Sequence, residues 1–139
     1  LMSTLKVPTV SIVIGEGASG GALGLGVTNE ILMMENTWYS VISPESCSSI
    51  LWKTWDYKEQ AASALKLTAP DLLEMKVIEG IIEEPLGGAH QDFEFSANSL
   101  KKAFQDSLKR LEKLSEEEIV THRIEKYSKM GAWVDSSAS

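Results

Sequence analysis

The chain has 139 residues and a mass of 15.2 kDa, which is close to the usual size of one domain. Hydrophobic residues make up 43% of it and charged residues 24%, so a packed core is possible and wholesale disorder is excluded. The 20 acidic residues outnumber the 13 basic ones, and the net charge of −7 argues against nucleic acid or an anionic membrane as a partner. No apolar run approaches the roughly 20 residues of a membrane span, and no signal peptide opens the sequence. We therefore expect a cytoplasmic protein.

The cysteine and histidine content excludes two further classes of site. Cys47 is the one cysteine, so it cannot form an internal disulfide. With His90 and His122 far apart in the sequence, no structural zinc site can be built, and we expect no metal in this chain. The first residue is Leu rather than Met, and Leu5–Pro8 lead straight into an apolar strand. This start is typical of a fragment of a longer chain.

Short strands and short helices alternate in the first part of the sequence. The β-branched segment Val10–Ile14 is bounded by Pro8 and Gly15 and predicts a buried strand. Ser43 followed by Pro44 is a strong helix start, because serine caps the helix and proline suits its first turn. The remaining predicted elements are strands at Ile31–Met34, Trp38–Ile42 (a hairpin-like pair) and Val77–Ile82, and helices at Ala22–Val27, from Asp56 to Leu65 and from Thr68.

The last part of the chain changes to a helical period. Apolar residues at helical spacing predict a first long helix with its buried stripe, and Ser115 with Glu118 forms a capping box for a second one that stops near Gly131. We expect three regions: a core over residues 1–92, a helical segment over 93–131 and a disordered tail over 132–139. The two predicted stripes are Ala97, Leu100, Phe104, Leu108 and Leu111, and Val120, Ile124 and Tyr127.

A glycine-rich loop over residues 15–26 contains six glycines and satisfies three different motifs. The spacing Gly15-x-Gly17-x-x-Gly20, with Glu35 twenty residues after Gly15, matches a dinucleotide-binding fingerprint. In that fold a helix N-terminus binds the pyrophosphate and the acid binds a ribose hydroxyl. The glycine-rich helix and the hairpin-like pair that follows it argue against this hypothesis.

The second motif, Gly17-x-Ser19-x-Gly21, matches the nucleophile elbow of serine hydrolases. A nucleophilic serine needs a base, and His90 is the better candidate because His122 lies in a highly charged helix. No acid is clearly placed to orient either histidine.

The third motif is the adjacent pair Gly20-Gly21 at a helix N-terminus, which can present two unshielded backbone N–H groups to one oxygen atom. This arrangement is an oxyanion hole. The alternative is that these glycines only allow the helix to pack tightly on a sheet. The pattern alone does not separate the two interpretations.

Three segments together closely resemble the carboxyltransferase α subunit family of bacterial acetyl-CoA carboxylase. The order and spacing of these segments agree with the family, and the resemblance covers nearly all of residues 5–131. Ala18 and Ser46 stand where glycine is frequent in the family, and Gln91 stands where a basic residue is usual. The segments are Val13–Leu23, Tyr39–Glu45 with Ile50–Lys53, and Glu84–His90.

This resemblance implies an α/β fold of the crotonase-like (ClpP/crotonase) type, a superhelix of ββα units, of which the chain would hold the C-terminal part followed by C-terminal helices. It implies an enzyme of fatty acid synthesis that moves the carboxyl group from carboxybiotin to acetyl-CoA and gives malonyl-CoA. The implied partners are a carboxyltransferase β subunit, in an α2β2 assembly, and a biotin carboxyl carrier protein. Biotin would be attached to that carrier and not to this chain.

The resemblance also assigns the glycine loop. Gly20 and Gly21 would supply the catalytic backbone donors, and Gly17, Ala18 and Ser19 would complete the carboxybiotin loop. A second pair, Gly87 and Gly88, would line the same substrate site through its backbone or serve only as a tight turn. The alternatives from other classes are a dinucleotide-binding oxidoreductase module and a non-catalytic crotonase-like scaffold that assembles other subunits.

Overall fold

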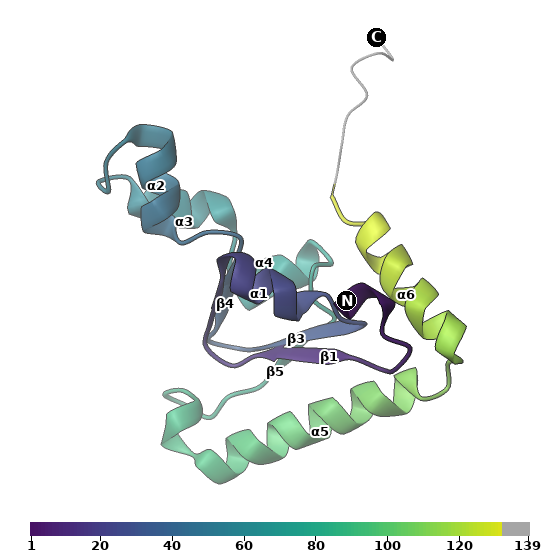
Figure 1. Cartoon of the computed structure of the whole chain (residues 1–139). Helices are drawn as coiled ribbons and strands as arrows, with labels where there is room; N and C mark the ends of the chain where they lie inside the picture. The colour runs from purple at the N-terminus through teal and green to yellow at the C-terminus, as the bar shows by residue number, and fades with distance from the viewer. Residues whose placement is uncertain (132–139) are drawn as a thin grey trace, which may run out of the picture.

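The computed structural model describes residues 1–131, and the predicted tail over 132–139 lies outside the described residues. Two successive ββα units open the fold after the short 3-10 helix η1 (Met2–Thr4) (Figure 1). The units are β1 (Val10–Val13), β2 (Glu16–Ala18) and α1 (Ser19–Gly26), then β3 (Glu30–Met34), β4 (Trp38–Ser40) and α2 (Pro44–Trp52). The chain continues through α3 (Lys58–Leu65), α4 (Ala69–Glu74), β5 (Gly80–Ile82), η2 (Ala89–Gln91), α5 (Phe93–Leu111) and α6 (Glu116–Ser128).

The strands form two parallel sheets. One has the order β1-β3-β5, and the other pairs β2 with β4. The predicted hairpin-like pair is therefore wrong, because β3 and β4 belong to different sheets. The Thr37 N–H closes a turn on the Met34 carbonyl at 3.2 Å, and the Trp38 N–H then bonds Gly15 at 3.2 Å, which directs the chain onto β2.

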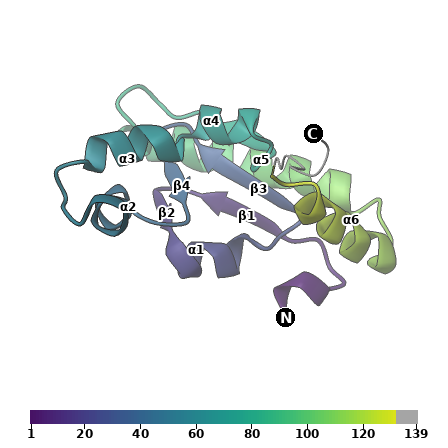
Figure 2. The same ribbon diagram turned by 90° about the horizontal axis from the view of Figure 1, so that it is seen from above.

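The core lies on both faces of β3, whose five residues are all buried. Ile31 and Met33 pack on one face with α4, whereas Leu32 and Met34 pack on the other with α5. Figure 1 shows α4 above the sheet and α5 below it, and Figure 2 gives the view of the same arrangement from above. β1 is only half-buried since it is an edge strand, and Ile14, predicted as its last residue, is 66% exposed.

The helix starts test the capping predictions. Ser43 caps α2 by accepting the Ser46 N–H at 3.2 Å, and the capping box of Ser115 with Glu118 is present in α6, so both predictions are confirmed. α3 begins at Lys58 rather than at the predicted Asp56, whose carboxylate accepts the Thr54 hydroxyl at 2.8 Å. α1 begins at Ser19, three residues before the predicted start.

The buried stripe of α5 is rotated from the predicted one. Leu100 and Leu111 face the core as expected, but Phe104 is 42% exposed. Ser96 and Ser107 are buried in its place. The Ser96 hydroxyl can be buried because it lies within 2.9 Å of the Ala89 carbonyl and within 2.8 Å of the Asp92 carbonyl.

A buried arginine attaches α6 to the start of the chain. Arg123 is 1% exposed, whereas Ile124 of the predicted stripe is 58% exposed. Within the described residues the Arg123 guanidinium donates to five neutral oxygens at 2.7–3.2 Å: the carbonyls of Met2, Leu5 and Val7, the Thr9 hydroxyl and the Asn29 side chain. Burial lowers the pKa of this guanidinium. The carbonyls of Met2, Leu5 and Val7 lie before β1 and have no partner strand, so the guanidinium supplies hydrogen-bond donors to them.

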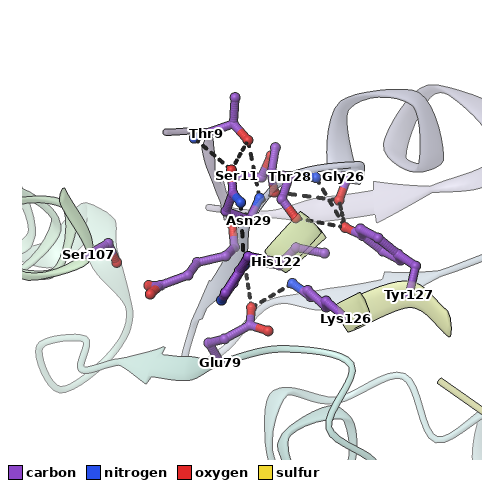
Figure 3. Close-up of polar contacts among 12 residues, drawn as sticks. Thr9, Ser11, Gly26, Thr28, Asn29, Glu79, Ser107, His122, Lys126 and Tyr127 are labelled. Atoms are coloured by element: carbon purple, nitrogen blue, oxygen red, sulfur yellow. Dashed lines mark hydrogen bonds and ion pairs between the residues drawn. The ribbon is translucent and has the colours of Figure 1, made fainter. Parts of the chain in front are cut away.

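Further polar contacts join α6 to the β strands (Figure 3). The Tyr127 hydroxyl accepts the Thr28 N–H at 3.1 Å and donates to the Gly26 carbonyl at the end of α1. Lys126 donates to Glu79 at 2.7 Å, and the same carboxylate oxygen accepts the Ile31 N–H at 2.6 Å. α6 therefore holds the C-terminal end of α1 and, through Glu79, the start of β3.

Glu30 at the start of β3 is buried and forms a two-point ion pair with Arg110 of α5. The Arg110 Nε and Nη2 atoms lie 3.1 and 2.7 Å from the two carboxylate oxygens. Burial alone would raise the pKa of Glu30, but the hydrogen bonds from Arg110 and Ser107 and the charge of Arg110 outweigh it, and the net shift is downward.

Replacing Arg123 by alanine should leave several buried acceptors without donors. Each unsatisfied buried group costs about 1–3 kcal/mol, so we expect the free energy of unfolding of Arg123→Ala to fall by about 3–5 kcal/mol in urea denaturation. Lys129→Ala, which removes the exposed i,i+4 pair with Glu125, is the control and should change it by less than about 0.5 kcal/mol. Equal losses in the two variants would contradict the role of Arg123.

The Glu30–Arg110 pair predicts a pH dependence of stability. Because the pKa of Glu30 is lowered in the folded chain, the pair stabilises the fold above the unfolded pKa, about 4.3, and this contribution is lost as the pH falls through the lower folded pKa. Urea denaturation between pH 7 and pH 3 should show a shallower loss of stability for Glu30→Gln than for the wild type. Parallel profiles would show that Glu30 does not titrate with folding.

Candidate functional site

The turn between β2 and α1 presents the glycine pair singled out in the sequence. Ala18 is extended, and Ser19 turns the chain sharply with φ of +60°, in the left-handed region that few residues other than glycine adopt. α1 begins at Ser19, so Gly20 and Gly21 lie in its first turn. Their N–H groups are among the first four of the helix, which have no acceptor within it.

This helix N-terminus is bare. Within residues 1–131 no side chain caps α1, and its first turn carries no acidic residue. Gly20 and Gly21 are both exposed. The partial positive charge of the helix end therefore faces outward without a neutralising group, which favours a negatively charged oxygen there.

The glycines of the loop divide into two kinds. A Cβ atom at Gly17 would approach the Tyr39 ring to 3.0 Å, and one at Gly26 would collide with the Tyr39 hydroxyl. These two glycines are needed for packing. A Cβ atom at Gly20 or Gly21 would meet no atom of the described chain within 4 Å. The fold therefore gives no steric reason for glycine at these two positions, which suits close approach by another molecule.

The second glycine pair lies at the carboxyl edge of the β1-β3-β5 sheet, after β5. Gly87 and Gly88 both have left-handed backbones, with φ of +91° and +102°. They line an open hollow together with Ile14, Gly15, Asn36 and His90.

The structure does not gather all the predicted site residues around one hollow. Gly17 and Ala18 line a groove along β1, which shares Ile14 and Gly15 with the hollow beside Gly87. Ser19 lines a separate apolar pocket with Tyr127 and with Tyr39, which also lines the groove. The groove and the hollow therefore meet at the β1–β2 connection, and the linings of these three cavities do not include Gly20 or Gly21.

Neither competing motif finds its partners. Ser19 and His90 line different cavities, and His122 instead lies with Nδ1 3.3 Å from the Asn29 side-chain nitrogen, so neither histidine is placed as a base for Ser19. Glu35 lies in the turn after β3 and accepts the Glu84 N–H at 3.4 Å. The strand β2 stands where a dinucleotide-binding unit would place its helix directly after β1.

Two features of the described residues bear on cofactors and membranes. Over residues 1–131, no group of three or more His, Cys, Asp and Glu side chains is placed to hold a metal ion. No helix in the same part of the chain has the length and apolar character needed to cross a membrane.

Sequence reasoning missed the residues that support the two glycine segments. Tyr39 supports the first loop, but aromatic residues are common in strands, so its place in β4 gives no local sign of its contacts with Gly17 and Gly26. Glu84 and Asn36 support the second segment. Their side chains meet only through the sheet topology, which has no signature in the local sequence.

The chain is similar in sequence to one family of known proteins. Residues 1–131 match the family described as "Acetyl co-enzyme A carboxylase carboxyltransferase-like". The chain is 60% identical over 134 residues to the acetyl-coenzyme A carboxylase carboxyl transferase subunit alpha of Chlorobium luteolum, covering 96% of this chain and 40% of that protein. It is 57% identical over 132 residues to the same subunit of Flavobacterium psychrophilum, covering 95% and 42%. The chain thus spans about two fifths of the length of these relatives.

A solved structure shares the fold. The transcarboxylase 12S crystal structure, described with methylmalonyl-coenzyme A and methylmalonic acid bound, aligns with a TM-score of 0.53 at 12% identity, covering 99% of this chain and 23% of that one. This likeness supports the α/β carboxyltransferase fold only. By the match over residues 1–131, the chain belongs to the acetyl-CoA carboxylase carboxyltransferase-like family.

Proposed function

We propose that the chain is part of a biotin-dependent carboxyltransferase α subunit that moves the carboxyl group from carboxybiotin to acetyl-CoA and gives malonyl-CoA. The observation that carries this proposal is the bare N-terminus of α1, where Gly20 and Gly21 are exposed and leave room for another molecule. Family membership supports the reaction, and the geometry of α1 supports the place.

The Gly20 and Gly21 N–H groups would bind the biotin ureido oxygen. When bound, biotin supplies the carboxyl group and a ureido oxygen on which negative charge develops as that group leaves. Backbone donors at a helix end suit this charge, because they are fixed before the reaction and need no reorganisation. The left-handed Ser19 orients them by beginning the helix abruptly after β2.

The remaining parts of the proposal concern the larger assembly. The two ββα units are consistent with a crotonase-like superhelix, of which residues 1–92 would form part and residues 93–131 a helical addition. Gly17, Ala18, Ser19, Gly87 and Gly88 would line the carboxybiotin site. A β subunit would bind acetyl-CoA, a carrier protein would hold biotin covalently, and the enzyme would work in the cytoplasm as α2β2. The position of the chain in the C-terminal part of the subunit stays a prediction.

The backbone role of Gly21 predicts which substitutions abolish activity. A Cβ atom at Gly21 would meet no atom of the described chain within 4 Å, so a valine side chain has room to begin there and would obstruct the oxygen that the N–H groups bind. We expect Gly21→Val to lower kcat by about two orders of magnitude, as removal of an oxyanion donor does. Ser19→Ala should have a far smaller effect. The assay is steady-state carboxyl transfer by the full-length subunit reconstituted with β.

Gly24→Val is the matched control, because Gly24 lies in the same helix and a Cβ there also meets no atom within 4 Å of the described chain. It should stay close to wild-type activity, and circular dichroism should show that all variants are folded. A folded Gly21→Val enzyme with wild-type kcat would refute the assigned site. A folded but inactive Ser19→Ala enzyme would show that the Ser19 hydroxyl takes part in the reaction and would also contradict the assignment to backbone donors alone.

The proposed function also predicts that activity depends on the β subunit. If this subunit supplies only the biotin side of the site, the full α subunit alone should show no measurable decarboxylation of malonyl-CoA, and should gain it when β is added. The measurement is release of CO2 from labelled malonyl-CoA by α, β and the mixture. Activity of α alone equal to that of the mixture would contradict the division of the site between subunits, whereas an inactive mixture would favour the scaffold hypothesis.

A further inference from the structure

The Glu84 carboxylate joins two loops at the carboxyl edge of the β1-β3-β5 sheet. One carboxylate oxygen accepts the Asn36 backbone N–H at 3.0 Å. The other accepts the Asn36 side-chain amide at 3.1 Å and the Ala89 backbone N–H at 3.0 Å. Asn36 lies in the turn after β3 and Ala89 begins η2, so one side chain connects segments that are 53 residues apart in the numbering.

The segment that Glu84 closes is the turn that holds Gly87 and Gly88. Within it, the Gly88 N–H donates to the Pro85 carbonyl at 2.9 Å, and the Gln91 N–H donates to the Gly88 carbonyl at 3.0 Å. A Cβ atom at Gly88 would lie 3.3 Å from the His90 ring and 3.8 Å from the Glu84 carboxylate. The carboxylate therefore fixes the turn at its Ala89 end, close to the glycines themselves.

The charge of Glu84 strengthens these contacts. Burial pulls its pKa upward, but the hydrogen bonds from Asn36 and Ala89 and the nearby His90 outweigh burial and lower it. Glu84 is therefore ionised at neutral pH. Hydrogen bonds to an ionised acceptor are stronger than those to a neutral one, so the carboxylate of Glu84 holds the turn more firmly than a neutral side chain would.

We propose that Glu84 is a positioning residue that holds the Gly87–Gly88 turn in the shape required to contact the biotin ureido ring, a role that rests on the proposed function. The hollow beside this turn is also lined by Gly15, which directly precedes β2 and the loop leading to Gly20. Glu84 itself is a lining residue whose polar contacts go to Asn36 and Ala89. Because both carboxylate oxygens accept hydrogen bonds from these residues, the effect of Glu84 on biotin would pass through the backbone of the turn.

The first test follows the turn directly, by hydrogen exchange of backbone amides in the full-length subunit. In Glu84→Ala we expect the Ala89 amide to exchange about tenfold faster, equivalent to about 1.4 kcal/mol. Glu84→Gln keeps a carbonyl acceptor and should restore part of the protection. The control is Glu83→Gln, which alters the exposed neighbouring carboxylate and should leave exchange unchanged. Wild-type exchange at Ala89 in Glu84→Ala would overturn the proposal.

The second test is kinetic and uses the subunit reconstituted with β, with malonyl-CoA as carboxyl donor and free biotin as acceptor. We expect Glu84→Ala to lower kcat/KM for biotin about tenfold while KM for malonyl-CoA stays unchanged, because misplacing one contact loop affects one substrate. Glu84→Gln should recover part of the loss. A general folding defect would change both substrates and would not be rescued.

The kinetic outcomes separate this proposal from the proposed function. A loosened turn with unchanged kcat/KM for biotin, in an enzyme that Gly21→Val inactivates, would overturn the role of Glu84 and leave the function standing. Full activity of a folded Gly21→Val enzyme would instead tell against the proposed site, whatever Glu84 does.

Discussion

The geometry of the glycine loop depends on the packing of the Tyr39 side chain against two glycines. Its ring lies against Gly17 in β2 and its hydroxyl against Gly26 at the end of α1, so any larger residue at either position would push the loop away from β4. With both ends of the β2–α1 segment fixed in this way, the first turn of α1 lies free at the surface. The packing glycines thus determine where the exposed pair, Gly20 and Gly21, can present its N–H groups.

Buried charges hold the long helices in the positions that this arrangement requires. Arg123 binds carbonyls of the N-terminal segment, and Glu30 pairs with Arg110 of α5. Tyr127 reaches the last carbonyl of α1, so the position of α6 is transmitted to the helix that carries the candidate site. These polar contacts are directional, unlike apolar packing, and we infer that they fix the register of each helix on the sheet.

Local signals in the sequence predicted much of this fold. Ser43 and Ser115 were correctly identified as helix caps because capping depends on neighbours three residues away. The predicted stripe of α6 was wrong at Ile124, which is exposed, whereas Val120 and Tyr127 are partly buried. An apolar pattern cannot reveal that Arg123 is buried against distant carbonyls. The same holds for the separation of β3 from β4. Gly20 and Gly21 were selected by family resemblance, whereas the bare helix end became visible only in three dimensions.

The most direct measurement is a crystal structure of the full-length subunit with its β partner and bound biotin. We expect the ureido oxygen about 2.7–3.1 Å from the backbone nitrogens of both Gly20 and Gly21. We also expect the first turn of α1 to keep its conformation when biotin binds. Biotin bound elsewhere, with the N-terminus of α1 facing solvent or another part of the substrate, would contradict the central claim.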